Sequence, residues 1–227
     1  MRFPLLSTYI YLARLVCLSP RTFVRHGNEP HHHLFCFSLP YYNSYVPHDI
    51  PFPEKDLVVL IDRGSGSRSI TNQAQLVSTI QSALDSSAQL RRTFPKGLKV
   101  YKWKPDAEIE NDIEIFNRAA MVLSPHGAGL SNIVWCSKGT PVLEICYDSF
   151  AVMQCPNMYW MLAVSYGLEY WFSLASGSYG SPMTVDVGDI KRITITALEE
   201  IGTPKHDAMM AKVDEYSTCP GRFGINE

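Results

Sequence analysis

The chain has 227 residues, 46% of them hydrophobic, and its formal net charge at pH 7 is −2. This length and apolar fraction are enough for a globular protein with a real core, and the nearly balanced charge argues against a general nucleic-acid or membrane-surface binder. The six cysteines form no Cys-x-x-Cys pair, which argues against a zinc ribbon or a thioredoxin-type redox site.

Residues 1–56 precede the first patterned segment and are predicted to be irregular. They are rich in Pro, His, Tyr and Phe and keep no helical or strand period for long. His31–His33 lie near Cys36, but no second Cys/His pair at ligand spacing accompanies them, so a metal site is not favoured. Arg14 interrupts the mildly apolar start. No apolar run reaches the roughly 18–20 residues that a membrane span needs, and a signal or anchor is not favoured.

Patterned sequence begins at Leu57. Residues 57–62 form an apolar, β-branched run that predicts a buried strand, and a turn with the sequence RGSGSRS follows it. Apolar residues at helical spacing then predict a helix over 71–90. The run LKVYKW, residues 98–103, predicts a second strand.

The same alternation continues through the second half of the chain. Strands are predicted at 121–124, 140–145 and 168–174, and helices at 108–120, 129–136, 157–167, 189–202 and 205–216. Strands that alternate with helices indicate an α/β fold, in which a doubly wound, Rossmann-like parallel sheet fills residues 57–227. Such sheets bind ligands in loops at the carboxyl ends of their strands, and both of the unusual loops fall there.

The first of these loops has the sequence SPHGAGLSN, residues 124–132. Glycine permits close approach of the backbone, and a helix that starts near Gly129 directs free N–H groups toward an anion. His126 can add a hydrogen bond, as can Ser131 or Asn132. The alternative is a tight strand–helix connection in which the glycines serve only packing.

The second loop, RGSGSRS, carries Arg63 and Arg68 around two glycines. Guanidinium groups bind phosphate through two parallel hydrogen bonds, although two solvated arginines on a turn remain the alternative. The third glycine of a dinucleotide fingerprint is missing, so a nicotinamide site is weakly supported. Glu144, on the strand after the His-Gly loop, is placed to hold a ribose diol. The alternative is a capped or solvated carboxylate.

Several chemistries lack their signatures. The HGAG sequence is similar to the oxyanion loop of esterases, but the chain has no Gly-x-Ser-x-Gly and no P-loop. It also has no Asp-x-Asp, the carboxylate pair with which metal-dependent sugar-nucleotide enzymes hold a divalent ion. A diphosphate bound here would be neutralised by arginine and a helix N-terminus, without a metal or other required cofactor.

Taken together, the Arg-x4-Arg…Asn loop, His-Gly-Ala-Gly-Leu-Ser-Asn and Val-Leu-Glu resemble the catalytic domain of glycosyltransferase family 61 over residues 57–170. The family includes O-linked N-acetylglucosaminyltransferases of the secretory pathway and plant xylosyl- and arabinosyltransferases. The resemblance implies an inverting enzyme of the two-domain GT-B architecture that uses a UDP-sugar. It carries the donor site over onto Arg63, Arg68, Asn72, His126, Gly127, Ala128, Gly129, Ser131, Asn132 and Glu144, with His126 also a candidate catalytic base.

The resemblance further implies a glycan or protein hydroxyl as acceptor, no nucleic-acid partner, a location in the ER or Golgi lumen and a membrane anchor outside this chain. A GT-B enzyme has two doubly wound domains, and 56 residues are too few for one of them. Residues 1–56 are therefore expected to be the remnant of a truncated N-terminal part. A nucleotide-sugar-binding module without turnover is the alternative function, and an esterase-like hydrolase is a third.

Overall fold

The computed structural model describes residues 50–105, 108–148 and 157–217. The chain divides into two compact units, residues 1–45 and 46–227, and all described residues belong to the second. Most of the segment predicted to be irregular, with its three histidines, lies outside the described residues. Its described end carries a single 3-10 turn, η1 (Phe52–Glu54), ahead of the first strand.

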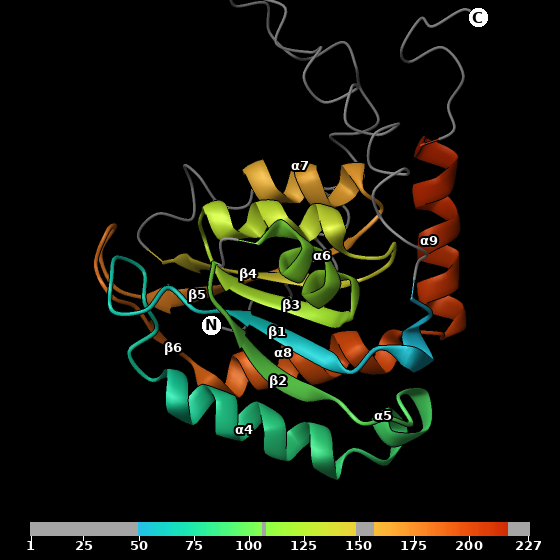
Figure 1. Ribbon diagram of the computed structural model, residues 1–227, viewed down its shortest axis with the longest axis horizontal. Coiled ribbons are helices and arrows are strands. Elements are labelled where there is room, and N and C mark those ends of the chain that lie inside the picture. Colours follow the sequence, from blue (N-terminus) through green and yellow to red (C-terminus); the bar gives the residue numbers. More distant parts are fainter. Residues whose placement is uncertain (1–49, 106–107, 149–156, 218–227) are drawn as a thin grey trace, which may run out of the picture. The chain divides into compact units, whose positions relative to one another are not determined.

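A six-stranded sheet forms the centre of this unit (Figure 1). In sheet order, the strands are β2 (Lys99–Trp103), β1 (Leu57–Ile61), β3 (Ala119–Pro125), β4 (Pro141–Tyr147), β5 (Glu169–Ser176) and β6 (Thr184–Val185). The first five are parallel, and β6 pairs antiparallel with β5. The predicted α/β class is confirmed, while the sheet is mixed and mostly parallel, because the short edge strand β6 runs against the others.

Helices cover both faces of the sheet (Figure 1). On one face lie α4 (Gln73–Ser86), α5 (Ala88–Thr93) and α8 (Val187–Glu200), and on the other lie α6 (Ile109–Asn117), the 3-10 helix η2 (Ala128–Trp135) and α7 (Asn157–Ser165). Helix α9 (Pro204–Ser217) ends the described chain. No helix among the described residues is long and apolar enough to cross a membrane.

The apolar run of β1 is continuous because both of its faces are covered. Val58 and Leu60 belong to the core beneath α4 and α8, whereas Val59 and Ile61 belong to the core beneath α6 and η2. Successive side chains of a strand point to opposite faces. A strand between two helical layers therefore has no polar face, as parallel sheets require.

Two predicted helices have different limits in the structure. The helix predicted over 71–90 divides at Ser87, whose side chain accepts a hydrogen bond from the Leu90 amide and caps α5. The helix predicted over 108–120 ends at Asn117, and Ala119 and Ala120 begin β3 instead. Both alanines are fully buried. Sheet pairing thus overrides the helix propensity of alanine at this point.

The order of the strands creates a switch point between β1 and β3. The chain runs from β1 outward to β2, and then returns across β1 to form β3 on its other side. The loops after β1 and β3 therefore leave neighbouring strands at the same edge. In open α/β sheets this crevice is the usual ligand site.

A buried carboxylate lies at the opposite edge, where β5 begins. Glu169 is 8% exposed, and burial, followed by the nearby carboxylate of Glu200, raises its pKa to about 7. The folded protein therefore holds a proton on Glu169 at pH values where the unfolded chain has lost it. Stability from this group is present below about pH 4.5 and is lost as the pH rises toward 7.

We therefore expect Glu169→Gln to be more stable than the wild type at pH 8 by up to about 3 kcal/mol, because each pKa unit corresponds to about 1.4 kcal/mol. The difference should vanish near pH 4. Urea unfolding at both pH values measures it, with Glu110→Gln on the exposed face of α6 as the matched control. Parallel pH profiles for the wild type and Glu169→Gln would contradict this account.

Candidate anion-binding site

The two loops meet over Gly127. An ideal Cβ atom added to Gly127 would lie 2.1 Å from Nη1 of Arg63 and 3.5 Å from Nη1 of Arg68. Both guanidinium groups therefore converge on Gly127, a residue of the His-Gly loop that has no side chain. The structure brings together Arg63, Arg68, His126 and Gly127, four of the residues predicted to form the donor site.

Backbone contacts hold the arginine loop in place. The Asp62 carboxylate accepts a hydrogen bond from the Gly64 amide at 2.8 Å, and Arg63 Nε donates to the Ser67 carbonyl at 3.1 Å. Arg68 has a left-handed backbone with φ of 64°, which is uncommon for a residue with a Cβ. Its Nη1 donates to the carbonyl of His126 at 2.9 Å, so Arg68 ties one loop to the other.

The arginine pair carries a positive charge that favours an anion. Burial lowers the pKa of Arg63, and the neighbouring charge of Arg68 lowers it further. Within the described part of the chain, no carboxylate forms an ion pair with either arginine. An anion that bridges the two guanidinium groups would relieve their repulsion and accept several charge-assisted hydrogen bonds.

Behind this pair, His126 is joined to a buried carboxylate. Its Nδ1 is hydrogen-bonded to Oε1 of Glu144, and the hydroxyl of Tyr170 donates to Oε2 of the same carboxylate. Glu144 is 0% exposed. Burial and the charge of Glu144 raise the pKa of Tyr170, so the phenol stays protonated. The ring of His126 also meets the ring of Tyr159 edge-on, with centroids 5.5 Å apart.

This position does not fit the prediction that Glu144 holds a ribose diol. Both carboxylate oxygens already have partners, and no part of the residue reaches solvent. Glu144 lies on the predicted strand, but its side chain points toward β5 and the His126 ring instead of out of the sheet. We assign Glu144 to the support of His126.

The two positions of the His-Gly-Ala-Gly sequence that carry glycine require it for different structural reasons. A Cβ on Gly129 would lie 2.9 Å from Cγ2 of Ile61 and 3.4 Å from the Trp103 ring, so Gly129 allows η2 to pack closely on β1. Packing, the alternative interpretation of the loop, thus explains Gly129. Gly127 instead leaves room for the arginines.

Helix η2 begins one residue before the predicted position and has 3-10 geometry. Its first helical bond runs from the Leu130 amide to the Gly127 carbonyl, so the amides of Ala128 and Gly129 precede it and have no acceptor within the helix. The side chain of Asn132 turns back to the Gly129 carbonyl at 3.2 Å. Ser131 is exposed.

Asn72 lies at the far end of the arginine loop. Its side-chain amide donates to the carbonyl of Val185 at 2.9 Å and accepts from the amide of the same residue at 3.2 Å. Asn72 therefore fastens the edge strand β6 to the start of α4. The structure does not place it with the arginines at Gly127.

Sequence reasoning missed the tyrosines and the segment between β5 and β6. The Tyr147 hydroxyl donates to the Ser181 carbonyl, which also accepts from the Arg68 amide at 2.8 Å. Tyr147 lies at the end of β4, and Tyr159, on α7, meets the His126 ring edge-on. An aromatic residue two positions after the strand predicted at 140–145 is the signal in the sequence for Tyr147. Nothing local in the sequence pointed to Ser181.

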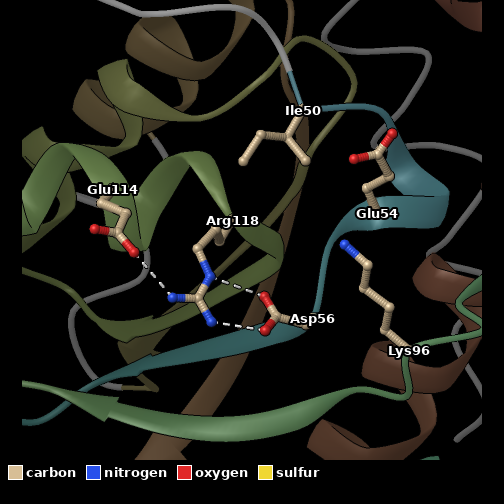
Figure 2. A pocket seen from close by; sticks show the side chains of 6 residues that line it. All are labelled: Ile50, Glu54, Asp56, Lys96, Glu114 and Arg118. Carbon is tan, nitrogen blue, oxygen red and sulfur yellow. Dashed lines mark hydrogen bonds and ion pairs between the residues drawn. The ribbon is translucent and has the colours of Figure 1, made fainter.

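A hollow of about 390 Å³ lies beside the start of β1, at the opposite end of that strand from the arginine loop (Figure 2). Arg118 donates to both carboxylate oxygens of Asp56, at 3.0 and 2.6 Å, and to Glu114 at 3.1 Å. Ile50, Glu54 and Lys96 complete the lining. Because Arg118 is neutralised by its neighbours, this hollow offers an anion no comparable charge.

The fold is α/β, with a mostly parallel sheet. The arginine loop and the His-Gly loop lie at the switch point of that sheet. Residues 7–143 match the family model described as Glycosyltransferase 61. The match covers more than half of the chain, and the chain belongs to glycosyltransferase family 61. No curated protein matches the chain. The matched region starts well before the motifs on which the resemblance was based, and it includes both loops.

We expect Gly127→Ala to weaken binding of inorganic pyrophosphate at least tenfold, because the added methyl group displaces the Arg63 guanidinium and removes one charge-assisted contact of about 1.5–3 kcal/mol. Isothermal titration calorimetry measures the affinity. Gly66→Ala is the matched control in the neighbouring loop, since its Cβ would meet only the Arg63 carbonyl at 3.7 Å. Unchanged affinity in Gly127→Ala would show that the arginines do not meet the anion there.

Proposed function

We propose that this protein is an inverting glycosyltransferase that moves a sugar, N-acetylglucosamine or a pentose, from a UDP-sugar to a hydroxyl of a glycan or protein. Family membership supports the reaction class. The convergence of Arg63 and Arg68 on Gly127 is the observation that carries the assignment of a diphosphate to this site. The described unit serves as the donor-binding half of a GT-B architecture, since its loops open at the switch point of a doubly wound sheet.

In the reaction, the acceptor oxygen bonds to the anomeric carbon from the face opposite UDP, and its proton passes to a general base. The bond between that carbon and the β-phosphate oxygen breaks, and UDP leaves with the electron pair. Negative charge therefore grows on the diphosphate in the transition state. Preorganised donors aimed at such charge lower the barrier by roughly 3–4 kcal/mol each.

The residues of the site have separate roles in this proposal. Arg63 and Arg68 grip the diphosphate, and the amides of Ala128 and Gly129 at the start of η2 add neutral donors. His126 contacts the ligand with the ring edge opposite Nδ1. Residues 178–182 border the site beside the arginines, because the Ser181 carbonyl accepts hydrogen bonds from the Arg68 amide and the Tyr147 hydroxyl.

Family membership also leads us to propose where the protein acts. The relatives with which the motifs were compared work in the secretory pathway, and we propose the ER or Golgi lumen for this protein. There it would meet its UDP-sugar donor and a glycan or glycoprotein acceptor. A membrane anchor outside the described residues fits the same setting.

Replacing either arginine tests the donor site. We expect Arg63→Ala and Arg68→Ala each to lower UDP affinity by roughly 10–100-fold, as loss of hydrogen bonds from a charged group does. Arg68→Lys should recover only part of the loss, because lysine keeps the charge but lacks the planar fork. Titration calorimetry with UDP measures each affinity, and Arg92→Ala on exposed α5 controls for the change in net charge.

UDP affinity that stays unchanged in both alanine variants would contradict the site. If UDP binds but the protein neither transfers the sugar nor hydrolyses a UDP-sugar, the chain is a nucleotide-sugar-binding module instead of an enzyme. A radiolabelled donor, assayed with and without an acceptor glycan, separates these outcomes from the binding result.

We also expect UDP binding to need no divalent cation. Among the described residues, no three His, Cys, Asp or Glu side chains are grouped so that they could hold a metal, and the arginines supply the positive charge instead. UDP affinity measured after dialysis against EDTA should equal the affinity measured with added Mg²⁺ or Mn²⁺. A tenfold or larger increase with either cation would contradict the metal-independent proposal.

A further inference from the structure

Three side chains from three adjacent segments of the sheet form one hydrogen-bonded line. Tyr170 on β5 donates to Glu144 on β4, and Glu144 is bound to His126, which follows β3 directly. The middle member is 0% exposed. The line thus connects a residue inside the sheet with the histidine at the anion site.

The direction of each hydrogen bond follows from the chemistry of the groups. A phenol beside a carboxylate donates its proton, and the raised pKa of Tyr170 keeps that proton in place. With Oε2 of Glu144 occupied in this way, Oε1 accepts from the Nδ1–H of His126. A carboxylate on Nδ1 fixes both the orientation and the tautomer of an imidazole.

Burial makes this carboxylate an effective anchor. A carboxylate in a low-dielectric interior must be paired with donors, and each oxygen here has one. The ring of Tyr159 packs edge-on against the imidazole, with centroids 5.5 Å apart, and restricts rotation from the other side. The backbone of His126 is held as well, because its amide donates to Ile145 and its carbonyl accepts from Arg68.

We propose that Tyr170 is a positioning residue for the glycosyl-transfer site. It acts through Glu144 to keep the proton of His126 on Nδ1 and the opposite ring edge toward the diphosphate. The part of this inference that concerns ligand binding rests on the proposed function. The part that concerns the imidazole is a property of the protein alone, so the two can be tested separately.

The first test uses the wild-type protein with ¹⁵N-labelled histidine. We expect a protected Nδ1–H proton resonance, assigned to His126 by its loss in His126→Gln, because the bonded proton is shielded from solvent beneath the loop. If neutral His126 instead carries its proton on Nε2, the proposed line of hydrogen bonds is wrong. This measurement needs no variant of Tyr170 or Glu144.

The second test is Tyr170→Phe, which removes only the hydroxyl. Oε2 of Glu144 then loses its donor and the carboxylate can rotate, so the Nδ1–H resonance should broaden or disappear. UDP affinity should fall by roughly threefold to tenfold, as it does when one ordinary hydrogen bond is lost. Tyr101→Phe, on the exposed edge strand β2, is the matched control and should change neither quantity.

The outcomes separate the two proposals. If Tyr170→Phe keeps the Nδ1–H resonance and wild-type UDP affinity, Tyr170 does not position His126. If the resonance is lost as expected but the wild-type protein binds no UDP, the positioning is confirmed and the proposed function fails. If neutral His126 of the wild type carries its proton on Nε2, the inference fails whether or not Tyr170→Phe folds.

Discussion

Two guanidinium groups held together over a glycine are the constraint on which this site depends. Like charges at close range repel one another, more strongly where they are partly buried. Burial lowers the pKa of Arg63, and the charge of Arg68 lowers it further. The arrangement persists because Arg68 is tied to the His126 carbonyl and to Ser181. The folded protein therefore stores an unfavourable charge arrangement that an anion would relieve, and this is the physical reason to expect one there.

The sheet supplies the precision that such a site needs. Ser124 of β3 pairs with Glu144 of β4, and Glu144 pairs with Phe172 of β5, so this register sets the line from Tyr170 to His126. A shift by one residue would turn Glu144 to the other face of the sheet. The positions of the His-Gly loop and of the buried hydrophobic core are for this reason set by the same strand pairings.

The sequence was sufficient for the features that local chemistry determines. The β1 strand was predicted from its continuous apolar, β-branched run, and the two loops from arginine, histidine and glycine at the ends of strands. The start of β3 at Ala119 could not be predicted, because pairing with β1 overrides the local preference for helix. The short strand β6 has no period to detect. The roles of Glu144 and Tyr170 depend on contacts between strands, which no spacing along the chain records.

The His-Gly-Ala-Gly motif does not by itself determine what each of its residues does. Its two glycines are equivalent in the sequence, yet Gly127 makes room for Arg63 while Gly129 makes room for Ile61. The functional and the packing interpretations of the loop were posed as alternatives, and each explains one glycine. A charged residue also has a role other than the expected one. Glu144 was expected to contact the ligand, but it forms a hydrogen bond with His126 instead. In this protein the residues of the proposed anion site are placed by a second layer of polar groups inside the sheet. The sequence alone does not show that layer, because its contacts join different strands.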